Sequence, residues 1–337
     1  LNDTSLWLAR WLTGNDSLSK SNALAAVQGI QMLDTDSQRS RVREMIYTAL
    51  RTTGRDSLKA DSPFAANYDR GYAALDLVFP GIGKQNAGGS FSSYTGEIRL
   101  LSSRIKTERG GNIEIMIPGG DLIAGLSNTA ESLTTTPPSG KDAGVLGLVA
   151  VAKDSSISGF ARDDILVNQS RILTVGGGDI LLWSSEGDID AGKGKKTATA
   201  VPPPIVRTDG QGNVTQELQG AVSGGGIGAL EPRNGVAGNV DLIAPKGTIN
   251  AGDAGIRAGN LTLAAQVVLG ADNITVSGTS AGTPVADTSA VTAASSGASN
   301  AGDVSSTTAA LSQNLSDAAR AAEELKQAFK PTFISAE

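Results

Sequence analysis

Acidic side chains in a glycine-rich segment are the residues of this chain best suited to chemistry. Glu186, Asp188 and Asp190 lie in GGDILLWSSEGDIDAG, and Asp121 lies in the similar earlier segment GNIEIMIPGGDLIAG. Carboxylates that converge can act as general acid and base on a glycosidic bond, or they can bind Ca²⁺ through oxygen. A carbohydrate-processing enzyme is therefore one alternative function.

A third copy of the pattern argues against catalysis. The segment GNVDLIAPKGTINAG has Thr248 and Asn250 where the second copy has Asp188 and Asp190. Asp, Asn and Thr next to glycine are typical of turns, because their short side chains bond to nearby backbone groups. We therefore expect turn residues, and we predict that the protein is not an enzyme and has no catalytic, cofactor or metal site.

Other polar candidates also have a structural interpretation. Asp163 and Asp164 precede a predicted strand, where turn chemistry or a solvated strand end is expected. Arg104 and Arg171 occupy equivalent positions, which indicates a repeated structural role rather than substrate binding. A solvated loop tip is expected at Lys193, Lys195 and Lys196.

Two further motifs resemble ligand sites. Trp183 aligns with Met116 and Ile243, which favours an apolar position of the repeat over a sugar-stacking platform. The segment SGGGIGAL, with Gly224–Gly228, is as glycine-rich as a nucleotide loop but lacks the Walker lysine. A flexible turn is expected there.

The composition excludes several classes of protein. The chain has no cysteine and no histidine, so disulfides, thiolate nucleophiles and histidine-dependent triads are excluded. Its 34 acidic and 28 basic residues give a net charge of −6, which predicts no nucleic-acid partner. The longest nearly apolar run, Ala143–Ala152, is too short to cross a bilayer as a helix, so no membrane insertion is predicted.

An internal repeat dominates the middle of the chain. Residues 98–125 align without a gap on residues 165–192, at an offset of 67, with 12 identities in 28 positions. Residues 178–192 align on residues 238–252 at an offset of 60. Repeated short phrases of this kind are typical of solenoids.

The period within each phrase predicts how the repeat folds. Apolar residues alternate with polar ones, as at Ile180 and Leu182, and again at Val240 and Leu242. Such rows must face inward, and the glycines between them permit bends that a Cβ would obstruct. The sequence therefore predicts a mainly β protein, a right-handed parallel β-helix with an α-helical N-terminal section and a C-terminal helix.

Helical periodicity and composition set the domain boundaries. Apolar spacing predicts a third helix with Asp36 as N-cap and Gly54 at its end. A low-complexity linker and an amphipathic helix are expected in the tail, and that helix could cap the solenoid, dock on the helical section or pair with another chain; capping is the preferred interpretation. The expected parts are a helical section 1–92, a β-helix 93–278 with a long loop at about 193–233, a linker 279–310 and a helix 311–330.

Several phrases together resemble one known family. GGDILLWSSEGDIDAGKGKK, DDILVNQSRI, GNVDLIAPKGTINAGDAGIRAGNLTLAA and GYAALDLVFPG are similar to the C-terminal region of filamentous-haemagglutinin-like exoproteins of two-partner secretion. The resemblance covers roughly residues 6–278. It lacks a counterpart for the tail after Gly278.

The resemblance implies a secreted module at the surface of a Gram-negative bacterium, exported by an outer-membrane two-partner-secretion transporter. It implies a role in adhesion, aggregation or extracellular matrix, with a host or bacterial surface glycan or protein, or other copies of the chain, as partner. It brings no catalytic residues. A self-assembling filament subunit is a further alternative, because open solenoid ends expose strand edges.

Overall fold

The structure, a computed structural model, describes residues 3–82, 94–101, 103–126, 146–193, 205–208, 214–217, 225–232 and 235–284. These residues belong to the first of two units, Leu1–Pro284, and the second unit, Val285–Glu337, lies outside them. The expected helix 311–330 and all but the first residues of the expected linker 279–310 therefore lie outside the described residues.

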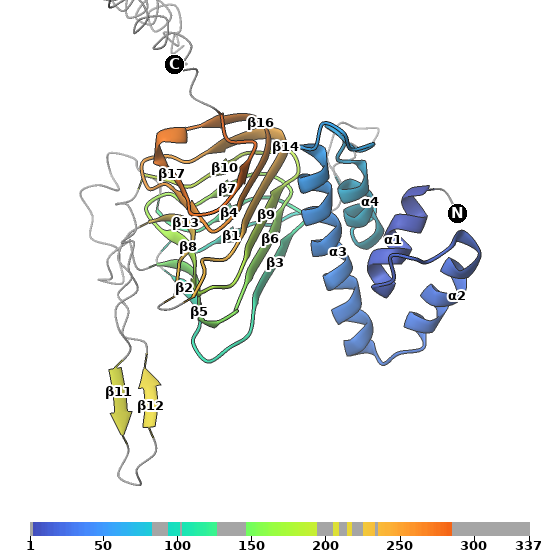
Figure 1. Cartoon of the computed structure of the whole chain (residues 1–337), viewed down its shortest axis with the longest axis horizontal. Helices are drawn as coiled ribbons and strands as arrows, with labels where there is room; N and C mark the ends of the chain where they lie inside the picture. The colour runs from blue at the N-terminus through green and yellow to red at the C-terminus, as the bar shows by residue number, and fades with distance from the viewer. Residues whose placement is uncertain are drawn as a thin grey trace, which may run out of the picture. The chain divides into compact units, whose positions relative to one another are not determined.

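The N-terminal section is α-helical, as predicted, and contains four helices (Figure 1). Alternating apolar and polar residues at helical spacing give each helix one apolar face, so that Leu8, Trp11 and Leu12 pack toward the same cluster. The helices are α1 (Asp3–Thr13), α2 (Lys20–Gln31), α3 (Thr35–Ser57) and α4 (Asp69–Val78).

Both predicted ends of α3 were wrong. The N-cap is Asp34, whose side chain accepts hydrogen bonds from the backbone N–H groups of Asp36 and Ser37. Asp36 lies in the first turn, where a negative charge stabilises the helix. Gly54 lies within the helix rather than after it, because the lack of a Cβ lets Ile243 of the sheet approach the helix backbone: a Cβ on Gly54 would lie 2.4 Å from Ile243 Cδ1.

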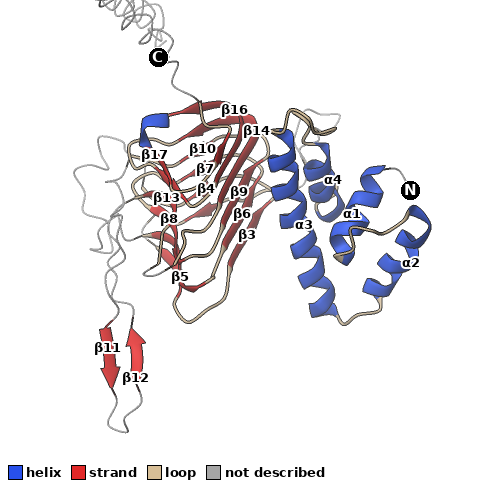
Figure 2. Ribbon diagram, viewed as in Figure 1, coloured by secondary structure: helices blue, strands red, loops and turns tan. Residues whose placement is uncertain are grey.

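Parallel strands form two sheets after the helices (Figure 2). In the ten-stranded sheet, the arm β1-β4-β7-β10 and the arm β3-β6-β9 meet at the long strand β14, which also pairs with β16, and β16 pairs with β18. The six-stranded sheet has the order β2-β5-β8-β13-β15-β17. The chain therefore visits the first arm, the second sheet and the second arm in turn, and then repeats this order. The strands are β1 (Ile98–Arg99), β2 (Arg104–Thr107), β3 (Ile113–Ile117), β4 (Leu122–Ile123), β5 (Gly147–Lys153), β6 (Ile157–Ala161), β7 (Ile165–Leu166), β8 (Arg171–Gly176), β9 (Ile180–Ser184), β10 (Ile189–Asp190), β11 (Ile205–Thr208), β12 (Val214–Glu217), β13 (Gly226–Ala229), β14 (Val240–Asn250), β15 (Ile256–Ala258), β16 (Leu261–Leu269), β17 (Ile274–Val276) and β18 (Ser280–Ala281), with a short 3₁₀ helix at Ala271–Asn273.

The strand register explains the repeat seen in the sequence. Ile98 pairs with Leu122, and Leu122 pairs with Ile165, so the offset of 67 spans two strand-to-strand steps rather than one. A single step covers about 19 to 24 residues where no insertion intervenes, as hydrogen bonds between equivalent turn residues show. It lengthens to 43 or 60 residues where the chain inserts extra segments.

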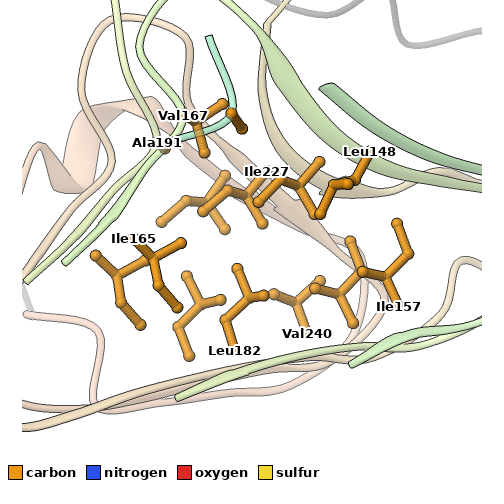
Figure 3. Close-up of a cluster of buried hydrophobic side chains, with 14 of the residues drawn as sticks. Leu148, Ile157, Ile165, Val167, Leu182, Ala191, Ile227 and Val240 are labelled. Carbon is orange, nitrogen blue, oxygen red and sulfur yellow. The ribbon is translucent and has the colours of Figure 1, made fainter. Parts of the chain in front are cut away.

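The alternating apolar residues form a core enclosed by the two sheets (Figure 3). Ile113, Ile180 and Val240 are buried, and they are connected in register through Ile157. The predicted inward rows Ile180/Leu182 and Val240/Leu242 both lie in this core, which confirms the direction of the alternation. Burial of such rows is the main stabilising contribution expected of apolar side chains.

A second apolar cluster lies between the helices and the outer side of β6, β9, β14 and β16 (Figure 1). Trp183 belongs to this cluster and not to the central core, and its in-register neighbours Phe160 and Ile243 lie there too. A Cβ on Gly71 of α4 would lie 2.6 Å from Trp183 Cη2. The apolar position predicted for Trp183 is therefore buried, but against helices.

Two long segments leave the sheets at the same corner. One joins β4 to β5 and the other joins β10 to β13. Because β4 and β10 flank β7, and β5 and β13 flank β8, both segments cross the corner that Val167–Ser170 closes between β7 and β8. This corner, called the loop-bearing corner below, includes the antiparallel pair β11–β12 in the second segment.

Two predicted boundaries differ from the structure. The expected loop at 193–233 contains β13, so the expected turn at Gly224–Gly228 is a strand from Gly226 onward. Glycine suits this strand because a Cβ on Gly226 would lie 2.5 Å from the carbonyl oxygen of Gly255. The strands also continue beyond Gly278, since Ser280 and Ala281 pair with β16.

Candidate functional site

The carboxylates singled out in the sequence gather at the corner before β4, β7 and β10. Asp121, Asp164 and Asp188 each precede one of these strands, and because the strands are neighbours in register, the three residues follow one another along the corner. Glu186 and Asp163 lie one or two residues further back. The structure thus brings together five of the acidic candidates.

These carboxylates accept hydrogen bonds from backbone N–H groups. Oδ1 of Asp121 accepts from the N–H of Asp164 at 2.9 Å, and Oδ1 of Asp164 accepts from the N–H of Asp188 at 2.7 Å. Oδ1 of Asp188 then accepts from the N–H of Thr248 at 2.7 Å. We call this series the acidic ladder. Each carboxylate therefore has a structural role, but it accepts from a turn N–H group of the next strand and not, as the sequence predicted, from the nearby backbone of its own turn.

Like charges along the acidic ladder affect Asp164. Burial raises the pKa of this carboxyl, and the negative charges of Asp121, Asp188 and Asp163 raise it further. The hydrogen bond from the N–H of Asp188 acts in the opposite direction without cancelling the increase. A raised carboxyl pKa is one property of an acid catalyst, but here a carboxyl oxygen already accepts a hydrogen bond from the backbone N–H of Asp188.

Ion pairs or hydrogen bonds involve the remaining acidic candidates. Arg162 donates from Nε and Nη2 to the two carboxylate oxygens of Asp163. Lys246 Nζ lies 2.7 Å from both carboxylate oxygens of Glu186. Asp190 accepts from the N–H of Gly192 and from the side-chain amide of Asn250.

A second ladder of polar turn residues runs along the corner before β3, β6, β9, β14 and β16. Asn112 Oδ1 accepts from the N–H of Ser156, and Ser156 Oγ accepts from the N–H of Asp179. Asp179 Oδ1 accepts from the N–H of Asn239, and Asn260 Oδ1 accepts from the N–H of Thr279. We call this series the amide ladder. It was not predicted from the sequence, although the Asn, Asp or Ser before each apolar row is the signal that indicates it.

The basic candidates lie outside the acidic ladder and differ in their exposure. Arg104 and Arg171 share one column, because both pair in register with Gly147. Their surroundings differ, since Arg171 is buried whereas Arg104 is exposed on the edge strand β2. Lys193 is exposed at the start of the second long segment, and Lys195 and Lys196 lie outside the described residues.

A buried ion pair between α3 and the sheet was not foreseen from the sequence. Asp241 of β14 is fully buried, and Arg55 donates to its two carboxylate oxygens at 2.8 and 2.9 Å. Arg51 Nε lies 3.4 Å from Oδ2 of the same carboxylate. The hydrogen bond with Asp241 raises the pKa of Arg55 further above its usual range. These contacts fix the helical section on the sheet and leave Asp241 unable to reach a ligand.

Within the described ranges, no three histidine, cysteine, aspartate or glutamate side chains come together as metal ligands. No helix in the part of the chain that the structure describes has both the length and the apolarity to span a bilayer.

Comparison with known proteins identifies one family. Residues 177–285 match the family model described as filamentous haemagglutinin family outer membrane protein, which confirms the resemblance over this part of the chain. The matched segment runs from β9 through β18 and includes the end of the acidic ladder. No curated protein and no solved structure gives a significant match. The similarity to this family is therefore shown for residues 177–285 and not for the rest of the chain.

Proposed function

We propose that this chain is a secreted, non-catalytic module of a bacterial surface exoprotein that acts in adhesion, aggregation or extracellular matrix. The observation that carries the proposal is the match of residues 177–285 to the filamentous haemagglutinin family. Export by an outer-membrane two-partner-secretion transporter, and a surface glycan or protein as partner, are parts of the same proposal.

The proposed scaffold is a right-handed parallel β-helix. Support comes from the recurring strand order and from the parallel pairing of all described strands except β11 and β12. Parallel connections in one sheet are almost always right-handed. A crystal structure of the chain tests the closure of each turn and its hand.

The proposed binding region is the loop-bearing corner. Segments carried by a rigid scaffold are common sites of recognition, and two long segments leave the sheets here while the intervening turn is only Val167–Ser170. The engaged carboxylates of the acidic ladder support a binding role over a catalytic one.

A spliced variant tests this assignment. Residues 192–225 are replaced by a copy of Asn168–Ser170, the residues that close the same corner between β7 and β8. Fluorescently labelled wild-type chain is expected to bind intact bacterial or epithelial cells in flow cytometry, and the spliced variant is expected to lose that binding while keeping its circular dichroism spectrum. Equal binding by both chains would move the site elsewhere, and no binding by the wild type would contradict the adhesive function. Release of new chain ends from acidic polysaccharides would favour the enzyme alternative.

A further inference from the structure

The two ends of the parallel sheets present unpaired strands. At one end, β1, β2 and β3 each have only one described partner; we call this the first edge. The other end, which we call the last edge, also has strands with only one described partner. They are β17, β18 and residues 267–269 of β16. Unpaired strands offer rows of backbone N–H and C=O groups to another chain.

The backbone direction at each edge follows from the described hydrogen bonds. The N–H of Ile113 donates to Ser156 and the carbonyl of Ile117 accepts from Arg162, so these groups point toward β6. Alternate residues of a parallel strand point to opposite sides, so the backbone groups of Glu114 and Met116 point away from β6. At the last edge, the N–H of Ser277 donates to the carbonyl of Ala258, so the backbone groups of Ser277 point toward β15. The backbone groups of Ile274 and Val276 therefore point away from β15, toward the open side.

We propose that the first edge binds the last edge of a second copy of this chain, so that copies join head to tail. The first argument is the polarity of the two ladders. At each step of both ladders the side-chain acceptor belongs to the earlier strand and the donor to the later strand. The donor is a backbone N–H group except between Asn239 and Asn260, where the side-chain amide of Asn260 donates to Asn239 Oδ1. The first edge therefore offers backbone N–H donors of turn residues, such as the N–H of Asn112. The last edge offers a side-chain acceptor, the hydroxyl of Thr279.

This polarity selects the partner. Thr279 Oγ1 donates to Asn260 Oδ1 and keeps lone pairs that can accept from the Asn112 N–H of another copy. Two first edges would place donors against donors and would pair their strands antiparallel. A contact between unlike ends is heterologous, and its repetition gives an open chain of subunits rather than a closed dimer.

The second argument is that apolar columns of the core reach both edges. Ile105 of β2 is 40% exposed, and Ile274 of β17 is partly buried against the core. Stacking the two edges in register would place Ile274 over Ile105 and remove both from water. The column runs from Ile105 through Leu148, Ile172, Ile227 and Ile256 to Ile274.

Charge does not oppose this contact. The strands of the first edge carry Arg99, Arg104, Lys106 and Glu114, three basic residues and one acidic residue, whereas Asp272 is the only charged residue between 259 and 284. The first edge is therefore net positive and the last edge carries one negative charge, so the net charges of the two edges attract. The proposal goes beyond surface adhesion, because it needs neither the loop-bearing corner nor a foreign partner.

Two single variants block one edge each. Ile105→Arg places a charge at the end of the apolar column on the first edge. Ser280→Pro removes an N–H that points away from β16 and leaves the described bonds of β18 in place. Leu77→Arg, on α4, makes the same chemical change as Ile105→Arg at a residue that is 57% exposed and distant in sequence from both edges.

Sedimentation velocity over a concentration series tests the proposal with the full chain. Wild type and Leu77→Arg are expected to form a growing series of oligomers, and each edge variant alone is expected to stay monomeric with an unchanged circular dichroism spectrum. A mixture of the two edge variants retains one free first edge and one free last edge, so it is expected to stop at a one-to-one dimer. A monomeric wild type up to its solubility limit, unchanged assembly of the edge variants, or a mixture that stays monomeric would overturn the proposal. Loss of cell binding by the spliced variant is independent of all these outcomes.

Discussion

Individual glycines decide how closely the helices approach the sheet. In an exposed helix, replacing glycine by alanine stabilises the protein, because alanine loses less conformational entropy on folding. Gly54 should behave in the opposite way, since its Cβ would lie 2.4 and 2.5 Å from two carbons of the fully buried Ile243. We expect Gly54→Ala to lower the free energy of unfolding by about 1–3 kcal/mol, the usual cost of overpacking.

Gly29 provides the matched control. It lies in α2, and a Cβ there would meet no atom within 4 Å. Gly29→Ala is therefore expected to raise the free energy of unfolding by about 0.5 kcal/mol. Urea unfolding of both variants checks the pair; the same sign of change in both would contradict the close contact between α3 and β14.

Asp164 gives the acidic ladder a predictable dependence on pH. Because folding raises the pKa of this carboxyl, its contribution to stability is present at low pH and is lost as the pH rises through the folded pKa. Asp164→Asn keeps an acceptor for the N–H of Asp188 and removes the charge. We expect the variant to be more stable than wild type near neutral pH, by less than about 1 kcal/mol because water screens the site.

The advantage of Asp164→Asn should shrink when the pH is lowered from about 7 toward about 4, because the wild-type carboxyl loses its charge as it takes up a proton. Chemical unfolding at both pH values measures the difference. Asp61→Asn makes the same chemical change in an exposed turn outside the ladder and is the matched control. A variant less stable than wild type at neutral pH would show that the charge helps the ladder.

At the scale of elements, two acidic strand residues, Asp241 and Glu114, form ion pairs with α3 and differ in burial. Asp241 is fully buried beside Arg55, whereas the Arg43–Glu114 pair has half-exposed side chains 3.2 Å apart. We expect Asp241→Asn to lower the free energy of unfolding by about 2 kcal/mol, because a buried partner is lost while Arg55 stays partly solvated. Glu114→Gln should have an effect below about 0.5 kcal/mol in the same urea titration. Equal effects would mean that Asp241 is not desolvated as described.

The elements could be predicted from the sequence where their residues alternate regularly. The inward rows at Ile180 and Val240, and the helical section, follow from local periodicity alone. The end of α3 could not be predicted in this way, because Gly54 is tolerated only through its contact with Ile243, which is distant in sequence. β13 was missed for the same reason: its glycines fit between β8 and β15, which are known only from the fold.

The candidate site was predictable in kind but not in detail. The replacement of Asp188 by Thr248 in the next repeat indicated a structural residue, and Asp188 has such a role, although its carboxylate bonds to the next strand rather than to its own turn. Its direction, with each acceptor on the earlier strand, depends on which residues become neighbours, and insertions between the repeats hide this in the sequence. The buried role of Asp241 was hidden too, since only the docked helix reveals its partner.

At the scale of the whole molecule, insertions are accommodated without disturbing the sheets. Equivalent residues stay in register whether they are 24 or 60 positions apart in the sequence. This is physically reasonable because the entropy cost of closing a loop rises only slowly with its length. The sheets can therefore keep one core while the loop-bearing corner varies.

The helical section has a different relation to the sheets, because it covers apolar surface. A chain that begins at Tyr94 would expose Trp183, Phe160 and Ile243, which are buried under the helices. Large exposed apolar patches cause aggregation, so this truncation should yield insoluble protein or a soluble form that strongly binds a hydrophobic dye. A chain that ends at Pro284 keeps the whole first unit and should match the full chain in dye binding and in thermal midpoint. Solubility, dye fluorescence and circular dichroism of the two truncations distinguish them, and a soluble, dye-negative chain from Tyr94 onward would show that the sheets do not need the helices.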